Sequence, residues 1–315
     1  MLSGPASASR SAGVSWVPVN LNQEDVVVGA KSLLLIGLIA ILLHGAPAQA
    51  AESYDNCTGF ITTLPATVTS QGTWCLNKDL ATAISSGNAI TINTNNVTID
   101  CNGYKLGGLT AGAGTSARGI FASNRVNSTV RHCNIRGFYV GVYLTGASSG
   151  GHLIEDNRFD GNTYYGMIVQ GDGSVIRRNL VFNTGGSTTG VYNATGISAQ
   201  TSVDIIDNTV VGVTGSSGGD GSAYGIYTTG LSASTIQGNS VRTLVPSGAG
   251  HAYGIRNTTS DRLSIRDNEL TGDSGGGSVG LTCTNANGRA IGNDISLFGT
   301  AISLCTDASG NDSSP

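Results

Sequence analysis

The amino-acid sequence predicts an all-β protein whose short strands stack as the coils of a solenoid. Three observations lead to this prediction. Glycine contributes 47 of the 315 residues, and so much glycine is costly inside helices. Short segments alternate between apolar and polar residues, as half-buried strands do. Two sequence probes also recur together every 22 to 30 residues or so, which indicates a repeat architecture.

The composition excludes several other classes of protein. Charged residues make up 11% of the chain and proline only 6 residues, which is too little of either for a solvated disordered chain. The glycines follow no Gly-X-Y period, so collagen is excluded. The net charge is −4, and no basic run exceeds the pair Arg177-Arg178. We therefore expect no nucleic-acid partner.

The first 50 residues predict an N-terminal extension with an export signal. Lys31 precedes an apolar run at residues 32–43, and Ala48-Gln49-Ala50 follows as a small-residue cleavage site. We expect cleavage before Ala51 and a secreted or periplasmic protein. The apolar run is shorter than the roughly 20 residues of a membrane span, so we expect no stable span after cleavage. An uncleaved anchor is the alternative.

The remaining chain divides into an N-terminal cap and first coil (51–96), a stack of coils (97–305) and a flexible C-terminal tail (306–315). The first probe, Ile-x-x-Asn, marks one turn of each coil. Its Asn residues should form a mainly structural column that passes amide hydrogen bonds up the stack. The expected ladder consists of Asn102, Asn157, Asn179, Asn208, Asn239, Asn268 and Asn293.

The second probe, Gly followed by an apolar residue, marks another strand of each coil. It interleaves with the first probe, so each unit contains several short strands. Such units bury their apolar residues only by stacking on their neighbours. The probe matches at Gly119, Gly141, Gly166, Gly196, Gly225, Gly254 and Gly280.

All six cysteines lie after the predicted cleavage site, which is typical of disulfides in an exported chain. Several pairings are open, but partners about one coil apart could staple adjacent coils. This favours Cys57–Cys75, Cys101–Cys133 and Cys283–Cys305. No Cys-x-x-Cys pair occurs, so a cysteine-based zinc site is not expected. We expect no cofactor and assign no metal ligands.

Two segments carry a more specific resemblance. Asn-Asn-Val-Thr-Ile-Asp-Cys-Asn-Gly (95–103) and Val-Arg-His-Cys-Asn-Ile-Arg-Gly-Phe (130–138), with the Ile-x-x-Asn units after them, resemble the right-handed parallel β-helix repeat family, which has the pectin-lyase-like fold. The resemblance covers about residues 58–305. It implies a single-stranded right-handed parallel β-helix of about eight coils. Members of the family include polysaccharide lyases, hydrolases, epimerases and adhesins, so the resemblance implies no single activity.

In enzymes of this family, the substrate groove lies on the outer face of the strand that follows the long loops. Here those loops are rich in Gly and Ser, and the Gly-apolar strand follows them. Alternation places the residue two after each Gly on that outer face. The expected substrate-binding residues are Phe121, Tyr143, Tyr227 and Arg256, because rings can cover apolar sugar faces. An ordinary neutral β surface is the alternative interpretation.

The outward residues of this face include no carboxylate, His or Lys, although glycoside hydrolysis generally needs two carboxylates. Asp220 and His251 lie on successive long loops and are the weak candidates for a catalytic acid/base pair. They could equally be solvated loop residues. A column of alternating charges that includes Asp156 and Arg178 predicts a structural ion ladder, with a catalytic group as the alternative.

We therefore expect an exported protein that binds polysaccharide or another cell-surface partner without catalysis. One alternative is a polysaccharide lyase, glycoside hydrolase or epimerase of the pectin-lyase-like fold. Another is a structural or adhesive surface rod. Whether the protein is an enzyme stays open at this point.

Overall fold

The computed structural model describes residues 56–190, 193–216, 218–230, 233–258, 262–273, 275 and 277–314. All of them belong to the second of two compact units, Ser53–Pro315, into which the chain divides. The predicted signal segment and its cleavage site before Ala51 lie outside the described residues. The described secondary structure is β-strand throughout, apart from one short 3-10 helix, η1 (Leu109–Ala111).

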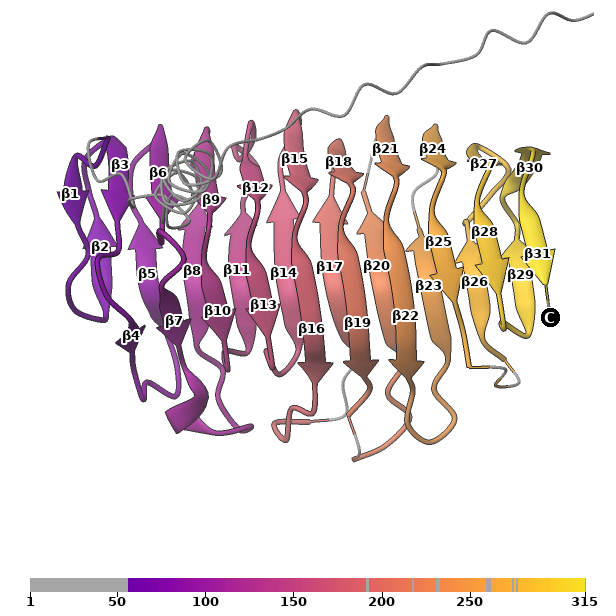
Figure 1. Ribbon diagram of the computed structural model, residues 1–315, viewed down its shortest axis with the longest axis horizontal. Coiled ribbons are helices and arrows are strands. Elements are labelled where there is room, and N and C mark those ends of the chain that lie inside the picture. Colours follow the sequence, from indigo (N-terminus) through magenta and orange to yellow (C-terminus); the bar gives the residue numbers. More distant parts are fainter. Residues whose placement is uncertain are drawn as a thin grey trace, which may run out of the picture. The chain divides into compact units, whose positions relative to one another are not determined.

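The strands form three parallel sheets that run side by side along the stack (Figure 1). Sheet A consists of β1 (Gly59–Phe60), β3 (Gly72–Cys75), β6 (Val97–Asp100), β9 (Ser128–Arg131), β12 (Leu153–Glu155), β15 (Ser174–Arg177), β18 (Val203–Ile206), β21 (Ser234–Gln237), β24 (Leu263–Arg266), β27 (Gly288–Ile291) and β30 (Thr306–Ser309).

Sheet C consists of β4 (Leu80–Ala81), β7 (Lys105–Gly107), β10 (Asn134–Arg136), β13 (Arg158–Asp160), β16 (Leu180–Gly185), β19 (Thr209–Thr214), β22 (Ser240–Val245), β25 (Glu269–Thr271), β28 (Asp294–Ser296) and β31 (Asp312–Ser314). Sheet B consists of β2 (Ala66–Val68), β5 (Asn88–Ile92), β8 (Arg118–Ser123), β11 (Val140–Thr145), β14 (Tyr165–Gln170), β17 (Ala194–Gln200), β20 (Ala223–Thr229), β23 (Ala252–Asn257), β26 (Val279–Thr282) and β29 (Thr300–Ser303).

Each full coil visits sheet A, then sheet C, then sheet B, so the predicted parallel solenoid is confirmed. One coil shows how the sequence builds it. Ile205 in β18, Val210 in β19 and Ile226 in β20 are all fully buried, whereas the residue after each of them is half-exposed. No single coil encloses these side chains, so each apolar layer is closed only by the coils on either side.

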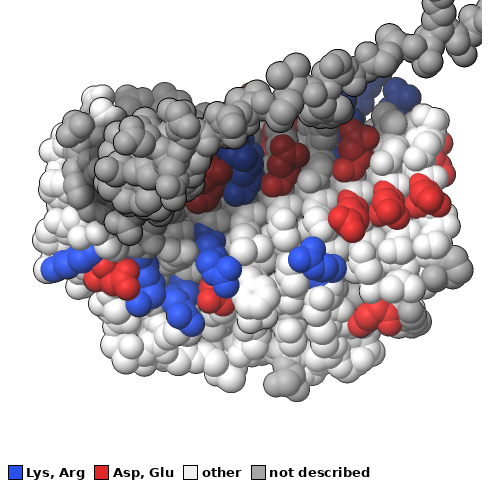
Figure 2. Space-filling view, viewed as in Figure 1, with Lys and Arg blue, Asp and Glu red and all other residues white. Residues whose placement is uncertain are grey.

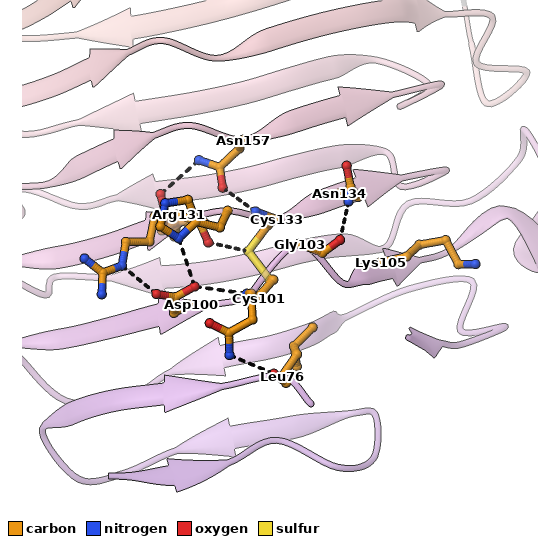
Figure 3. The surroundings of a disulfide bond; sticks show 12 residues. Leu76, Asp100, Cys101, Gly103, Lys105, Arg131, Cys133, Asn134 and Asn157 are labelled. Atoms are coloured by element: carbon orange, nitrogen blue, oxygen red, sulfur yellow. Dashed lines mark hydrogen bonds and ion pairs between the residues drawn. A yellow bond between two sulfur atoms is a disulfide. The ribbon is translucent and has the colours of Figure 1, made fainter. Parts of the chain in front are cut away.

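Three disulfides join cysteines of adjacent coils. They are Cys57–Cys75, Cys101–Cys133 and Cys283–Cys305, which are the pairs that a one-coil separation favours. The first lies at the N-terminal end of the described stack and the last near its C-terminal end. Cys101 and Cys133 are almost fully buried beside the start of the asparagine ladder (Figure 3).

The buried asparagines form a continuous hydrogen-bonded ladder. Each side chain donates to the carbonyl oxygen of the Ile-x-x-Asn apolar position one coil back and to the next amide oxygen in the stack. Asn208, for example, donates to Ile176 O at 3.0 Å and to Asn239 Oδ1 at 3.0 Å. The ladder runs through Asn157, Asn179, Asn208, Asn239, Asn268, Asn293 and Asn311.

The structure places two ends of this column differently from the expectation. Asn102 does not join the ladder: it lies in the left-handed region with φ 48°, and its Nδ2 donates to Leu76 O at 3.1 Å. The ladder instead begins where Asn157 accepts a bond from the amide of the disulfide-bonded Cys133 at 3.0 Å. At the other end, Asn311 extends it by one coil.

Residues 306–314, for which the sequence predicts a flexible tail, form β30 and β31. β30 pairs with β27 in sheet A, and β31 pairs with β28 in sheet C. The segment lacks the apolar alternation of the other strands and is largely exposed, so the hydrophobic pattern gives no signal for it. Backbone pairing and the Asn311 amide hold it against the last full coil.

Candidate functional site

The outer face of sheet B carries an unbroken register of outward side chains. Strand pairing brings one residue from each coil into a single column, including the four residues that the sequence singles out, Phe121, Tyr143, Tyr227 and Arg256. The column reads Thr67, Thr91, Phe121, Tyr143, Ile168, Ser198, Tyr227, Arg256, Thr282 and Ser303. Apart from Arg256 the column is neutral, and aromatic rings gather at two places in it.

The first gathering, the Arg118 cluster, consists of Arg118, Phe121 and Tyr143 on β8 and β11. The two rings meet edge to face with centroids 5.8 Å apart. The Arg118 guanidinium lies 4.9 Å from the Phe121 centroid and 5.0 Å from the Tyr143 centroid. A cation over a ring face at this range is attracted by the ring quadrupole. All three side chains are half-buried, so the cluster forms a fixed but accessible surface.

The second gathering, the Arg256 cluster, consists of Tyr224, Tyr227, Tyr253 and Arg256 on β20 and β23. Tyr224 and Tyr253 stack with centroids 5.1 Å apart, and Tyr227 packs against Tyr224 at 5.4 Å. The Arg256 guanidinium lies 4.7 Å from the Tyr253 centroid, and its Nη1 donates to Tyr224 Oη at 3.2 Å. Tyr224 is buried, whereas the other three side chains stay half-exposed.

Three more tyrosines lie along the same edge, between the two clusters. Tyr139 and Tyr164 pack with ring centroids 4.8 Å apart, and Tyr164 meets Tyr165 edge to face at 4.3 Å. Burial, followed by its hydrogen bond with Tyr164, raises the pKa of Tyr165 well above its usual range. Its phenol therefore stays protonated within hydrogen-bond contact of Tyr164. With these three, seven of the eight tyrosines that the structure describes lie on this face.

Arg118 and the rings that precede each Gly reach this face because of a backbone constraint. A Cβ on Gly119 would lie 2.4 Å from Gly141 O and 3.0 Å from the buried Ile135 side chain, so this position points inward. The same holds at Gly225, where a Cβ would lie 2.3 Å from Val241 Cγ1. Because the glycine and the next residue both face the core, the residue before the glycine and the one two after it both face out. Strict alternation misses the first of these, which is why the sequence does not predict Arg118.

The structure does not join the two candidate acid/base residues. Asp220 Oδ1 accepts a hydrogen bond from the Ala249 amide at 2.7 Å and so holds the next loop in place. The His251 amide donates to Ser222 Oγ at 3.0 Å, and its ring meets Tyr253 edge to face at 6.1 Å. Within the described residues no ion pair links Asp220 to His251. His251 instead lies beside the Arg256 cluster.

The charged column is a network of ion pairs at the corner between sheets A and C. Arg178 contacts Asp156 at 2.7 Å and Glu155 at 2.9 Å, and Arg177 contacts Glu155 at 2.7 Å. The hydrogen bond from Arg178 lowers the pKa of the Asp156 carboxyl. These groups satisfy one another, which is the arrangement of a structural ion ladder. In the described part of the chain no three His, Cys, Asp or Glu side chains are placed to hold a metal ion.

One buried titratable group, His152, has no signal in the sequence. Its Nδ1 accepts a bond from the Ser128 amide at 3.2 Å, so Nε2 carries the proton and contacts Ser149 Oγ at 2.7 Å. Burial lowers the pKa of His152 to about 4. His152 lies at the start of β12 and not on the sheet B face, so we assign it a structural role.

Comparison with known proteins identifies the family. A sequence profile described as the right-handed beta helix region matches residues 79–241, which is more than half of the chain. This chain belongs to the right-handed β-helix family. The profile match begins one residue before β4 and ends in β22, so it covers both aromatic clusters except for Tyr253 and Arg256. No curated protein matches the chain.

Solved structures share the β-helix fold at low sequence identity. DFA-IIIase from Arthrobacter chlorophenolicus, in complex with GF2, matches with a TM-score of 0.50 and 14% identity over 75% of this chain and 62% of its own. The A-module of a mannuronan C-5 epimerase from Azotobacter vinelandii matches with a TM-score of 0.46 and 16% identity over 82% and 79%.

A tailspike protein of E. coli bacteriophage HK620, in complex with a pentasaccharide, matches with a TM-score of 0.43 and 12% identity over 80% of this chain and 55% of its own.

The chain spans less than two thirds of the length of the DFA-IIIase that it resembles. At these identities the comparisons establish the fold alone.

The disulfides bear on the compartment of this β-helix protein. Three disulfides are typical of an oxidising environment, which indicates an extracellular or periplasmic protein. Among the residues that the structure describes, no helix has the length and apolar character to cross a bilayer.

Proposed function

We propose that the protein binds a polysaccharide along the outer face of sheet B and does not turn it over. The observation that carries this proposal is the pair of accessible ring-and-guanidinium clusters, Arg118 and Arg256, in one register of the stack. A linear polymer lying along the stack axis can contact both clusters at once. Tyr143 and Tyr227 are three strand spacings apart, or about 14 Å.

The chemistry of this face suits carbohydrate. Tyrosine rings offer apolar faces to the C–H surface of a sugar, and their phenols contact its hydroxyls. Outward Gln170 and Gln200 lie in register beside the column and add neutral amides, while the two guanidiniums add donors. Since the rings are already packed against one another, little side-chain freedom is lost on binding.

The side-chain contacts of the candidate site favour binding without turnover over the activity of a lyase, hydrolase or epimerase. Asp220 is engaged with the Ala249 amide, and the sheet B column presents no carboxylate to a sugar. We also propose that the protein is exported and that its signal is cleaved before Ala51, in keeping with the three disulfides.

The proposal is tested by screening the purified protein on an array of intact polysaccharides and then measuring affinity for each bound polymer. Tyr253→Ala removes a half-exposed ring that supports Arg256. We expect it to weaken binding about tenfold, equivalent to about 1.4 kcal/mol. The matched control, Arg289→Ala, removes an exposed guanidinium from the outer face of sheet A and should leave affinity unchanged.

Product release from the same polymers is followed in parallel. Binding without new reducing ends or unsaturated sugars supports the proposal. Turnover that is lost in Asp220→Asn or His251→Ala would overturn the non-catalytic part of it. A wild-type protein that binds no polymer on the array would overturn the proposal as a whole.

A further inference from the structure

The outer face of sheet C lies away from the proposed binding face, and its charge changes sign along the stack axis. Strand pairing again brings one outward residue per coil into register, while the residues between them face the core. This sheet C column reads Lys105, Asn134, Arg158, Leu180, Thr209, Ser240, Glu269, Asp294 and Asp312. It is basic at one end and acidic at the other.

The basic end lies on β7, β10 and β13 and surrounds a hollow of about 350 Å³. Arg136 and Arg158 each approach Asp160 only to 3.9 Å, which is too long for a hydrogen bond, and both are about two fifths exposed. Lys105 contacts Asp79 at 2.9 Å. Three cations therefore share two carboxylates, and the two guanidiniums keep donors free for another acceptor.

The acidic end lies on β25, β28 and β31. Glu269, Asp294 and Asp312 are exposed and directly adjacent in the register, about 4.8 Å apart. None of them makes an ion pair within the described residues. Like charges directly opposite on neighbouring strands destabilise a sheet. Figure 2 shows basic side chains toward the indigo end of this face and a row of acidic ones toward the yellow end.

We propose that this face binds a second copy of the chain as an antiparallel two-fold dimer. A two-fold axis in the interface, parallel to the strands and passing over β19, reverses the stack and preserves position along each strand. It brings β7 over β31, β10 over β28 and β13 over β25. Arg158 then faces Glu269 of the second copy, and Lys105 faces Asp312. Asn134 lies over Asp294, and Arg136, two residues further along β10, lies over Ser296.

The same operation matches the centre of the face, between its basic and acidic ends. Phe182 on β16 falls opposite Arg242 on β22, which is exposed and whose Nη1 donates to Ser240 Oγ at 3.1 Å. A ring and a guanidinium facing each other attract. Val211 on β19 falls opposite Val211 of the second copy, and Thr209 opposite Thr209. Two cations of the basic end, Lys105 and Arg158, thus meet carboxylates, and no like charges fall directly opposite one another.

The face spans eight strand spacings from β7 to β31, or about 38 Å, so the dimer is small and held largely by charge. We expect self-association near neutral pH and about 20 mM salt that is lost in about 1 M NaCl, where the Debye length falls to about 3 Å. Sheet B faces elsewhere in the coil and stays free, so dimerisation and polysaccharide binding are independent properties.

A charge-swap experiment on the full chain tests the geometry, using sedimentation equilibrium at low salt. Arg158→Glu and Glu269→Arg each place like charges opposite one another at both ends of the dimer. Each should weaken self-association about tenfold or more. The double variant restores opposite charges and should return to within about threefold of wild type. Arg289→Glu, on the outer face of sheet A, is the matched reversal and should leave self-association unchanged.

Three results would overturn the proposal: a wild type that stays monomeric at low salt, single variants that associate as wild type does, or a double variant no better than the singles. Far-ultraviolet circular dichroism checks that each variant is folded. If Arg158→Glu does not fold, the pair Lys105→Glu and Asp312→Lys makes the same comparison at β7 and β31. Loss of dimerisation with polysaccharide binding intact overturns neither proposal and separates the two surfaces.

Discussion

Glycine near the start of the sheet B strands from β8 to β26 is required by the stack and not by the conformation of its own residue. At Gly225 an added Cβ would lie 2.3 Å from Val241 Cγ1 and 2.6 Å from Gly254 O. The second contact is backbone and cannot rotate away. The carbonyl of each glycine therefore packs into the space left by the missing side chain one coil back. This contact also turns the flanking tyrosines and arginines outward onto the candidate binding face.

Gly225→Ala should accordingly lower the free energy of unfolding by about 1–3 kcal/mol, the usual cost of overpacking a tight core. Gly114→Ala is the control, because its Cβ would meet only Thr188 Oγ1 at an ordinary 3.5 Å. That substitution should be neutral or slightly stabilising. Chemical denaturation followed by circular dichroism measures both. Equal losses of unfolding free energy in the two variants would show that the next coil does not crowd a side chain at position 225.

His152 links the stability of the stack to pH. Its pKa is lowered from 6.5 to about 4 by burial, so between these values the unfolded chain binds a proton that the folded chain does not. Stability is therefore full above about pH 6.5 and falls as the pH drops toward 4. The shift corresponds to about 3 kcal/mol over that range.

The difference between wild type and His152→Gln isolates this effect. The variant should lose most of the fall in thermal midpoint between pH 6.5 and pH 4.5, whatever its midpoint at neutral pH. Asp156, whose pKa is lowered by Arg178, contributes only at lower pH, since its stabilisation is lost below the pKa of an unfolded Asp. Parallel pH profiles for the two proteins would contradict the assignment of His152.

At the scale of the element, the asparagine ladder fixes the register of successive coils. Asn208 donates to Ile176 O, Ile206 O and Asn239 Oδ1, and it accepts from both the amide and the Nδ2 of Asn179. Removing the side chain leaves buried donors and an acceptor on two neighbouring coils without partners. Each such group costs about 1–3 kcal/mol.

Asn208→Ala should therefore destabilise the protein by about 3 kcal/mol or more. Asn311→Ala, at the C-terminal end of the same ladder, should cost about 1 kcal/mol, because Asn311 is partly exposed and water can replace its bonds. Equilibrium denaturation compares the two variants. A loss at Asn311 as large as that at Asn208 would contradict a ladder whose strength comes from burial.

The ends of the ladder also show where local sequence patterns fail. Asn102 matches Ile-x-x-Asn, yet it occupies the left-handed position that His132 and Asp156 hold in later coils, one residue before the ladder. Cys101, the residue directly before Asn102, forms the disulfide with Cys133. Asn311 joins the ladder although only the half-buried Ala308 stands at the apolar position three residues before it, and strand pairing holds it there.

At the scale of the whole molecule, the sequence predicts most of what is periodic. The coil order, the disulfide pairs and the column through Phe121, Tyr143, Tyr227 and Arg256 all follow from spacing, because stacked coils repeat it in space. What the sequence misses depends on contacts between coils. The packing of Gly119 exposes Arg118, and the polarity of the sheet C face emerges only when Arg158 and Glu269 are found in one register.

The central claim is that the sheet B face binds polysaccharide, and side-chain NMR of protein with isotope-labelled tyrosine tests it most directly. On titration with an oligosaccharide of the polymer selected by the array, we expect the NMR signals of Tyr227 and Tyr253 to shift. We expect no shift at Tyr104, which packs against the core away from this face. Binding that leaves Tyr227 and Tyr253 unmoved, or that shifts Tyr104 in their place, would contradict the account.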